Sequence, residues 1–356
     1  MVNSHILFLV KKYETRHLNF KVPKLLGSWY TGLVDVSTIN SRWRALIMLN
    51  NLSQTYPGHK RIPLPRFGFE MIEAASQENK VVIDANTLVL YDDLARSGMV
   101  VFRGFSDSLE DFNELISAHS VRITFDPARK ASTSNTAEIN AGRFEMGLHQ
   151  ENGNLPFTPD MQWFYCLVPA REGSQTTVCD GHRVLHELSS FTRKSFEQRK
   201  IKYSRRIPWP NVRRFLSIEL QVPHDDVTDD HLEQVNAMVN GQHYIRLDSN
   251  LIKSELIVDA ITTSRFSEKK AFCNSLLGPS VNYEPPVITW GDGEEIDFHT
   301  WDEIKDVTAT HTYDLFWNKG DIVVIDNSRV MHGRRRLTDA SRRIFGAQSY
   351  RKEDVV

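Results

Sequence analysis

The amino-acid sequence predicts an α+β fold with a mainly β core: a double-stranded β-helix (jelly roll, cupin-like) with flanking helices and a helical insert. Strand-like runs at 161–168 and 176–180, and again at 321–327, 328–333 and 342–350, bracket a long helix-rich stretch. The regular alternation of helices and strands that marks a doubly wound parallel sheet is absent. No GxGxxG or GxxxxGK[ST] motif occurs, so the sequence lacks the main signature of the nucleotide-binding folds.

The elements ahead of this core are short and well delimited. Residues 89–98, "VLYDDLARSG", predict a helix closed by Gly98, and "MVVFRGF" at 99–105 predicts a buried strand. Ser108 is a candidate N-cap for a second helix with apolar residues on one face. Residues 126–143 lack periodicity and are rich in polar residues, so we expect a long loop there, as a lid or as plain surface.

Three further elements are predicted between the two groups of strands. "TDDHLEQVNAMVNG" at 228–241 predicts a helix that begins after a threonine cap and ends before a glycine. "SRFSEKKAFCNSLLG" at 264–278 predicts a similar helix. "VITWGDGEEI" at 287–296 predicts a hairpin about its Gly-Asp-Gly turn.

These elements suggest how the 356 residues are divided. Residues 1–85 match no recognisable pattern, and we expect an N-terminal extension of unknown role that packs on the core. Residues 86–356 are expected to form the jelly-roll domain, with its helix-rich insert at about 182–285. This length is sufficient for a substantial hydrophobic core.

Composition excludes several classes of function. A net charge of −2, from 43 basic and 45 acidic residues, gives no global attraction to nucleic acid or anionic lipid. The apolar run "ILFLV" is too short to cross a bilayer, and neither it nor its flanks read as a signal peptide. Cys166, Cys179 and Cys273 form no CxxC motif and leave one thiol unpaired in any disulfide scheme, so we expect a reducing, cytoplasmic location.

The stretch "MGLHQENGNL" places His149 and Glu151 two positions apart. On a strand such residues face the same side, so both can point into a barrel. An imidazole and a carboxylate are two of the three ligands of the facial triad in non-haem Fe(II) oxygenases. His332, in "DNSRVMHGR", is the candidate third ligand. Alone, the pair also fits a solvated turn beside a half-buried histidine.

The surrounding sequence resembles a known family. "HQENGNLPFTPDMQWFYCLVPAREGSQTTVCDG", "GDIVVIDNSRVMHGRRRLTDASRRIFGAQSY" and "GMVVFRGF" are similar to the Fe(II)/2-oxoglutarate-dependent oxygenases of the taurine dioxygenase and clavaminate synthase group. The resemblance covers roughly residues 90–350 and is strongest at 146–181 and 320–350. The family's HxD or HxE, its glycine-rich turn with a threonine, and its distal histidine followed by an arginine occur in that order.

The resemblance implies a role for five residues. His149, Glu151 and His332 match the iron ligands, with glutamate in place of the commoner aspartate, as in the clavaminate synthase branch. Thr176, 27 positions after His149, matches the threonine whose hydroxyl contacts 2-oxoglutarate. Arg343, 11 positions after His332, matches the arginine that pairs with the distal carboxylate of 2-oxoglutarate.

Strand alternation limits the arginine assignment. Arg342 and Arg343 are neighbours, so they cannot both point into the barrel, and an inward arginine is costly unless an anion meets it. We expect Arg343 to be the inward residue, with Arg342 as the alternative. A second interpretation makes the whole arginine cluster at 334–336 and 342–343 a solvated strand edge.

The chemistry implied by the resemblance uses Fe(II), 2-oxoglutarate and O2. Decarboxylation of 2-oxoglutarate to succinate and CO2 would be coupled to hydroxylation, desaturation or cyclisation of a small molecule, such as an amino acid or a natural-product intermediate. Family halogenases have glycine or alanine at the carboxylate position, which Glu151 fills here, so halogenation is disfavoured. The sequence identifies neither the substrate nor the oligomeric state.

Several other functions compete with this one. A non-catalytic jelly-roll protein could bind a carboxylate ligand in the same pocket. The stretch 193–214 interleaves nine Arg or Lys residues with aromatic residues, a pattern that fits nucleic acid, an acidic carrier protein or a solvated amphipathic face. A nucleic-acid-directed demethylase is therefore a further candidate, which the near-neutral charge disfavours. His182 and His186 have a spacing that suits zinc, but a solvated helix start explains them better.

Overall fold

The computed structural model describes residues 17–23, 29–35, 59–64, 68–74, 87–105, 108–124, 136–139, 143–280 and 284–352. The chain divides into two compact units, Met1–Pro57 and Gly58–Val356. In the first unit, β1 (His17–Pro23) and β2 (Trp29–Asp35) form an antiparallel pair. All other described elements belong to the second unit, which contains the candidate site.

The main sheet of the second unit has the strand order β3-β4-β5-β18-β9-β20-β6, and β7 also pairs with β20. Its strands are β3 (His59–Leu64), β4 (Phe69–Ala74), β5 (Met99–Arg103), β6 (Ser120–Thr124), β7 (Ala137–Glu138), β9 (Met161–Val168), β18 (Ile322–Asp326) and β20 (Arg343–Arg351). The pairing of β4 with β5 is parallel, and the other pairings are antiparallel. Strands β3 and β4 precede residue 86, so the sheet begins before the predicted start of the core domain.

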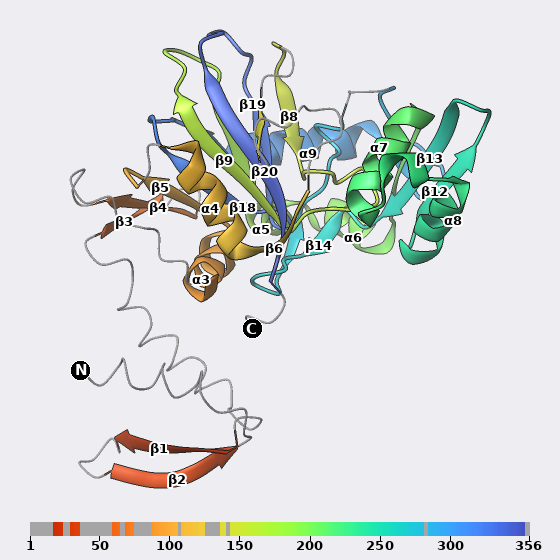
Figure 1. The fold of residues 1–356 in the computed structure, drawn as a ribbon. Coiled ribbons are helices and arrows are strands. Elements are labelled where there is room, and N and C mark those ends of the chain that lie inside the picture. Colours follow the sequence, from red (N-terminus) through yellow and green to blue (C-terminus); the bar gives the residue numbers. More distant parts are fainter. Residues whose placement is uncertain are drawn as a thin grey trace. The chain divides into compact units, whose positions relative to one another are not determined.

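Two helices lie against this sheet, as Figure 1 shows. Helix α3 (Thr87–Ser97) contacts β5 and β18 and ends before Gly98, whose φ of 76° is the left-handed conformation that glycine tolerates. Helix α4 (Leu109–His119) contacts β9 and β6, and the Ser108 hydroxyl caps it by accepting a hydrogen bond from the Asp111 N–H. The sequence prediction of both helices and of the Ser108 cap is confirmed.

A second sheet, β17-β10-β19-β8, packs face to face with the main sheet. Its antiparallel strands are β8 (Met146–His149), β10 (Thr176–Asp180), β17 (Thr312–Leu315) and β19 (Val330–Arg334). Val178 and Val330 of this sheet form one apolar cluster with Val101, Phe164 and Val323 of the main sheet. The predicted strands at 161–168 and 176–180 and the three near the C-terminus are therefore confirmed, and they compose the two facing layers.

The segment between these strands contains helices and also a third sheet. The helices are α5 (Gly181–Glu187), α6 (Ser190–Gln198), α7 (Trp209–Leu220), the 3-10 turn η2 (His224–Asp226) and α8 (Asp229–Met238), and α9 (Phe298–His311) follows later. The sheet has the order β12-β13-β11-β16, formed by β11 (Ile201–Pro208), β12 (Gln242–Arg246), β13 (Leu251–Val258) and β16 (Val287–Trp290). The predicted helix at 228–241 is confirmed as α8.

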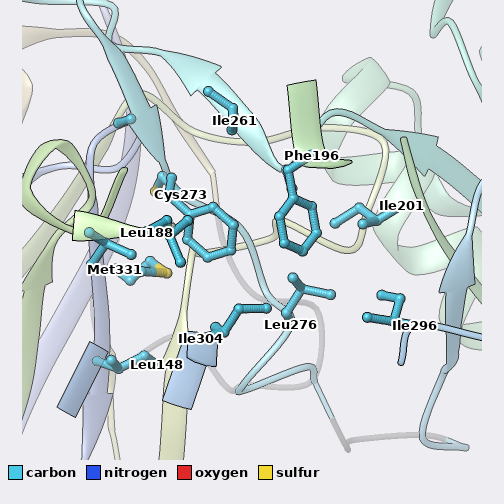
Figure 2. Packing of buried hydrophobic residues seen from close by; sticks show 14 of the residues in the cluster. Leu148, Leu188, Phe196, Ile201, Ile261, Cys273, Leu276, Ile296, Ile304 and Met331 are labelled. Carbon is cyan, nitrogen blue, oxygen red and sulfur yellow. The ribbon is translucent and has the colours of Figure 1, made fainter. Parts of the chain in front are cut away.

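A second apolar cluster joins the insert to the back of the second sheet. Figure 2 shows members of this cluster, among them Phe196, Leu276 and Ile304 of the insert and α9, and Leu148 and Met331 of the second sheet. Leu148 and Met331 precede His149 and His332 in β8 and β19. Because neighbouring strand residues face opposite sides, burial of these two side chains in the cluster turns both histidines toward the main sheet.

The sequence prediction of a helix at 264–278 is wrong. This segment forms a turn and strand β15 (Lys270–Phe272), which pairs with β14 (Ile261–Thr263). The buried Ser264 hydroxyl donates to the Asp326 carboxylate at 2.6 Å, and Glu268 has a left-handed φ of 59°. These tertiary contacts override the local helix propensity of the segment.

The predicted hairpin at 287–296 is half correct. Its turn forms, with Gly293 at φ 97° and the Trp290 N–H donating to the Glu294 carbonyl at 2.8 Å. Only its first arm, β16, is a strand, and it pairs with β11. Most of the predicted loop at 126–143 lies outside the described residues. Within the described ranges, no helix combines the length and apolar character needed to span a bilayer.

Candidate active site

The three predicted metal ligands meet between the two packed sheets. His149 on β8 and His332 on β19 are register partners, and their ring centroids lie 4.4 Å apart. The Glu151 Oε2 atom lies 3.2 Å from His332 Nε2 and 3.9 Å from His149 Nε2. The donor atoms of all three residues fall within 4.8 Å of one another.

Glu151 reaches this position from a turn and not from a strand. Strand β8 ends at His149, and Asn152 adopts a left-handed φ of 56°. The expectation that alternation along one strand directs His149 and Glu151 inward is therefore wrong for Glu151, although both side chains point into the same pocket.

The turn is fixed by Asn327, a residue that the sequence interpretation missed. Asn327 is fully buried, and its Oδ1 accepts the Glu151 N–H at 2.8 Å. Its Nδ2 donates to the Glu151 carbonyl at 3.1 Å and to the Pro159 carbonyl at 2.8 Å. One amide side chain therefore holds the backbone of Glu151 from both sides. Its position, five residues before His332 in the quoted "DNSRVMHG", was the available signal.

The donor set fits a divalent metal ion. His149 Nδ1 lies 2.9 Å from the Gly147 carbonyl, which can only accept, so Nδ1 carries the hydrogen and Nε2 presents a lone pair. Two imidazole nitrogens and one carboxylate are the donors of the facial triad that binds non-haem Fe(II). Among the described residues this is the one group of three or more His, Cys, Asp or Glu donors close enough to hold an ion, and it includes neither His182 nor His186.

The other end of the pocket is cationic. Thr176, Arg334 and Arg342 line it, and Glu151 is the one acidic side chain among its described lining residues. Both arginines are buried. Arg334 is paired in register with Thr176 and lies two residues after His332, on the same side of β19. That spacing could have identified Arg334 from the sequence, where it was considered only as part of a solvated cluster.

The structure corrects the arginine assignment. Arg342 is 8% exposed and lines the pocket, with its Nη2 donating to the Thr176 hydroxyl at 3.3 Å. The Arg343 side chain is 48% exposed and forms an ion pair with Glu138 at 3.1 Å. Strand alternation is obeyed, but its phase is opposite to the expected one, because β20 begins at Arg343 and its register shifts directly after that residue.

Burial of Arg342 has an electrostatic cost. Burial away from solvent, together with the neighbouring charge of Arg334, lowers the pKa of the Arg342 guanidinium to about 10. The Nε atom of Arg342 is buried without a hydrogen-bond partner in the described part of the chain. A buried cation of this kind is stabilised when an anionic ligand binds beside it.

Thr176 lies at the centre of the cationic end. Its hydroxyl oxygen accepts one hydrogen bond from Arg342 and another from the Trp317 indole N–H at 3.1 Å. Trp317 was also missed by the sequence interpretation, which had no spacing rule to connect it with Thr176. The predicted residues His149, Glu151, His332 and Thr176 are thus together in one pocket, whereas Arg343 lies outside it.

Comparison with known families agrees with this geometry. Residues 60–348 match the model of the family described as "Taurine catabolism dioxygenase TauD, TfdA family". The match covers most of the chain, so the protein belongs to this family of iron- and 2-oxoglutarate-dependent dioxygenases. The predicted cofactor set of Fe(II), 2-oxoglutarate and O2 is therefore confirmed at the level of the family.

Individual relatives are distant. A clavaminate synthase-like protein of Arabidopsis thaliana is 21% identical over 319 residues, which are 82% of this chain and 91% of the relative. The dapdiamide synthesis protein DdaC of Enterobacter agglomerans is 23% identical over 264 residues, 68% of this chain and 79% of DdaC. The crystal structure of PvcB from Pseudomonas aeruginosa superposes with a TM-score of 0.56 at 14% identity, covering 84% of this chain and 94% of PvcB. This similarity to PvcB establishes the sheet-rich α+β fold.

Proposed function

We propose that this enzyme hydroxylates a small molecule at an Fe(II) ion held by His149, Glu151 and His332, with 2-oxoglutarate bound by Arg342 and Thr176. The observation that carries the proposal is the arrangement of the pocket. A histidine–glutamate–histidine group lies at one end, and buried arginines lie at the other. Among the described lining residues there is no second carboxylate.

The charges of the residues that line the pocket support a dicarboxylate as its ligand. Among the described lining residues, two arginines, Arg334 and Arg342, face one carboxylate, Glu151, and a divalent ion would add two further positive charges. The planar guanidinium of Arg342 suits bidentate pairing with a carboxylate, and the Thr176 hydroxyl lies beside it. 2-Oxoglutarate supplies two negative charges, one for each end of the pocket.

When bound, Fe(II) and 2-oxoglutarate supply the oxidising chemistry, with succinate and CO2 as the products of the cosubstrate. The chain itself orients these groups and limits access of water. Asn327 fixes the backbone of Glu151, and the Gly147 carbonyl fixes the tautomer of His149. Ile139, Met146 and Phe164 provide apolar walls between the two ends of the pocket.

For the fold, we propose that the two packed sheets are the two layers of a double-stranded β-helix. The antiparallel order β17-β10-β19-β8 facing β18-β9-β20 supports this assignment, because the candidate ligands project into the space between such layers. The division into an extension at 1–85 and a domain at 86–356 stays a prediction. The pairing of β4 with β5 favours an earlier start for the domain.

For the substrate, we propose an amino acid or a natural-product intermediate, free or attached to a carrier protein. DdaC is named for dapdiamide synthesis, and PvcB is described as an Fe, alpha-ketoglutarate dependent oxygenase from an isonitrile synthetic pathway. A cytoplasmic location also stays a prediction, and the three free, buried cysteines are compatible with it.

Nucleic acid is a weaker candidate substrate because several charges in the basic stretch 193–214 are paired within the protein. Arg199 forms ion pairs with Asp292 and Glu294, and Arg206 forms one with Glu284. Phe196 and Tyr203 are buried in the apolar cluster and cannot stack on bases. The solvated amphipathic face is therefore the better interpretation of this stretch.

The test is succinate formation from 2-oxoglutarate by the aerobic, Fe(II)-loaded enzyme, measured across a panel of amino acids and carrier-bound acyl groups. We expect substrate-dependent succinate production that Glu151→Ala abolishes and that Glu145→Ala, at an exposed residue paired with Arg335, leaves in place. Binding of 2-oxoglutarate without succinate above the Glu151→Ala background would instead support the non-catalytic carboxylate-binding protein.

A further inference from the structure

Trp317 connects the apolar core to the cationic end of the pocket. It follows β17, and its partly buried ring packs on the cluster between the two sheets. The ring meets Phe164 edge-on, with centroids 6.4 Å apart, and Phe164 in turn meets His332 edge-on at 5.3 Å. These contacts fix the ring, so its one polar atom, Nε1, has a defined direction.

That atom donates to the Thr176 hydroxyl oxygen at 3.1 Å. A threonine hydroxyl has two acceptor lone pairs and one hydrogen. Here both hydrogen bonds to the oxygen come from groups that can only donate, the Trp317 indole and the Arg342 guanidinium. The Thr176 hydrogen must therefore point away from both donors, and Thr176 lines the pocket.

We propose that Trp317 is a positioning residue for 2-oxoglutarate: it orients the Thr176 hydroxyl so that its hydrogen is directed at a carboxylate oxygen of the cosubstrate. This inference rests on the proposed function. Without the indole N–H, the hydroxyl is free to rotate to other staggered positions, and it loses the donor that polarises it. Arg342 cannot replace Trp317 in this role, because its guanidinium is required by the same carboxylate.

The test is a double-mutant cycle on the affinity for 2-oxoglutarate. Trp317→Phe keeps an aromatic ring but removes the N–H, and Thr176→Val removes the hydroxyl while keeping the side-chain shape. Affinity is read anaerobically from the visible charge-transfer band that appears when 2-oxoglutarate is added to the Fe(II)-loaded protein. Fe(II) affinity, measured separately by calorimetry, should stay the same in these variants.

We expect Trp317→Phe to weaken 2-oxoglutarate binding by about 3- to 10-fold, the effect of one net hydrogen bond. In the Thr176→Val background the same change should have no further effect, because the oriented group is already absent. In the Thr176→Ser background, which retains a hydroxyl, the loss should reappear. Trp317→Met, which fills the volume with a flexible apolar chain, provides a second version should the Phe variant fold poorly.

Equal losses from Trp317→Phe with and without the Thr176 hydroxyl would overturn the inference, since Trp317 would then act through packing alone. Full affinity in a folded Trp317→Phe variant would also overturn it. A wild-type protein that binds Fe(II) but gives no saturable band with 2-oxoglutarate would contradict the proposed function itself. Failure of the inference and failure of the proposed function are thus distinguishable.

Discussion

Two exposed arginines of the insert and the two arginines of the pocket have opposite environments. On the third sheet and its surroundings, Arg199 lies 2.6 Å from Asp292 and Arg206 lies 2.7 Å from Glu284, and all four side chains are at least one-third exposed. In the pocket, Arg342 is buried and donates to a neutral hydroxyl. Arg334, which is also buried there, donates to the Phe144 carbonyl.

The difference indicates what each group of charges does. Exposed ion pairs contribute only about 0–1 kcal/mol each, so Arg199 and Arg206 serve solubility and local structure. Burial of a cation without a carboxylate partner costs several kcal/mol, and a fold keeps such a residue when a ligand supplies the missing charge. The exposed arginines of the basic stretch are therefore ordinary surface residues, whereas Arg342, which we propose to bind 2-oxoglutarate, lies in a second cluster.

The largest effect is expected at the metal end, where Glu151→Ala removes the one carboxylate among the described lining residues of the pocket. Divalent-ion affinity should fall by more than about 100-fold, beyond the losses typical of outer-shell partners. Calorimetric titration with Fe(II) under anaerobic conditions measures this, with Glu145→Ala as the exposed control. Unchanged affinity in the Glu151 variant would show that the three clustered side chains do not form the metal site.

Asn327→Asp is expected to have the next largest effect. The substitution keeps the shape and the acceptor oxygen but removes the donors to the Glu151 and Pro159 carbonyls. Leaving these buried carbonyls unpaired and introducing a buried charge should cost about 1–3 kcal/mol or more in the free energy of unfolding. Metal affinity should fall by about 10- to 100-fold as Glu151 loses its fixed position. Urea unfolding and Fe(II) calorimetry measure the two effects, and a loss of stability without loss of metal affinity would contradict the positioning role.

Arg342→Met tests the comparison directly, because a ligand-binding arginine should not stabilise the unliganded fold. We expect the free energy of unfolding of the unliganded protein to stay the same or to rise by up to about 2 kcal/mol. The stabilisation that Fe(II) with 2-oxoglutarate gives to the wild-type protein should disappear. Arg206→Met is the matched exposed control and should change neither quantity by more than about 1 kcal/mol. A clear loss of stability in unliganded Arg342→Met would instead make Arg342 a structural residue.

The smallest effect concerns Asp339, a partly exposed charge in the loop before Arg342. Hydrogen bonds from the Arg171 N–H and from Ser341 hold the pKa of the Asp339 carboxyl at about 2, below its ordinary value of 3.8. A lowered folded-state pKa means that the ionised carboxylate stabilises the fold above pH 3.8 and that this contribution is lost as the pH falls toward 2. Asp339→Asn should therefore lower the urea midpoint slightly at pH 7, and the difference from wild type should shrink below pH 3.8. A difference independent of pH would show that the charge is not involved.

The parts of the site that the sequence predicted are those fixed by local spacing and by the family resemblance. His332 and Thr176 lie on buried strands that the sequence predicted, whereas His149 ends the partly buried strand β8, and the family resemblance singled out all three residues. Strand alternation also predicts that only one of Arg342 and Arg343 faces inward. Which of the two faces inward does not follow from alternation, because it depends on the residue at which β20 begins and on the register shift of that strand.

Other features depend on contacts between distant segments. The turn that presents Glu151 is held by Asn327, 176 positions away along the chain. The segment 264–278 has helical spacing, but Ser264 donates to Asp326 and Phe272 is buried in the second apolar cluster, which favours a strand. No local pattern contains these partners, so a sequence-based prediction fails at such positions while the nearby strands are predicted correctly.

The most direct test of the central claim is an anaerobic titration of the Fe(II)-loaded protein with 2-oxoglutarate, comparing wild type, Arg342→Met and Arg343→Met. We expect a saturable visible charge-transfer band in wild type, nearly the same band at the same concentrations in Arg343→Met, and little or no saturation in Arg342→Met. Arg343 lies outside the pocket and pairs with Glu138, so it is a matched neighbour with no part in binding. A band that Arg343→Met abolishes and Arg342→Met preserves would contradict the account of the cationic end. No band in folded, Fe(II)-loaded wild type would contradict the assignment of the pocket as a 2-oxoglutarate site.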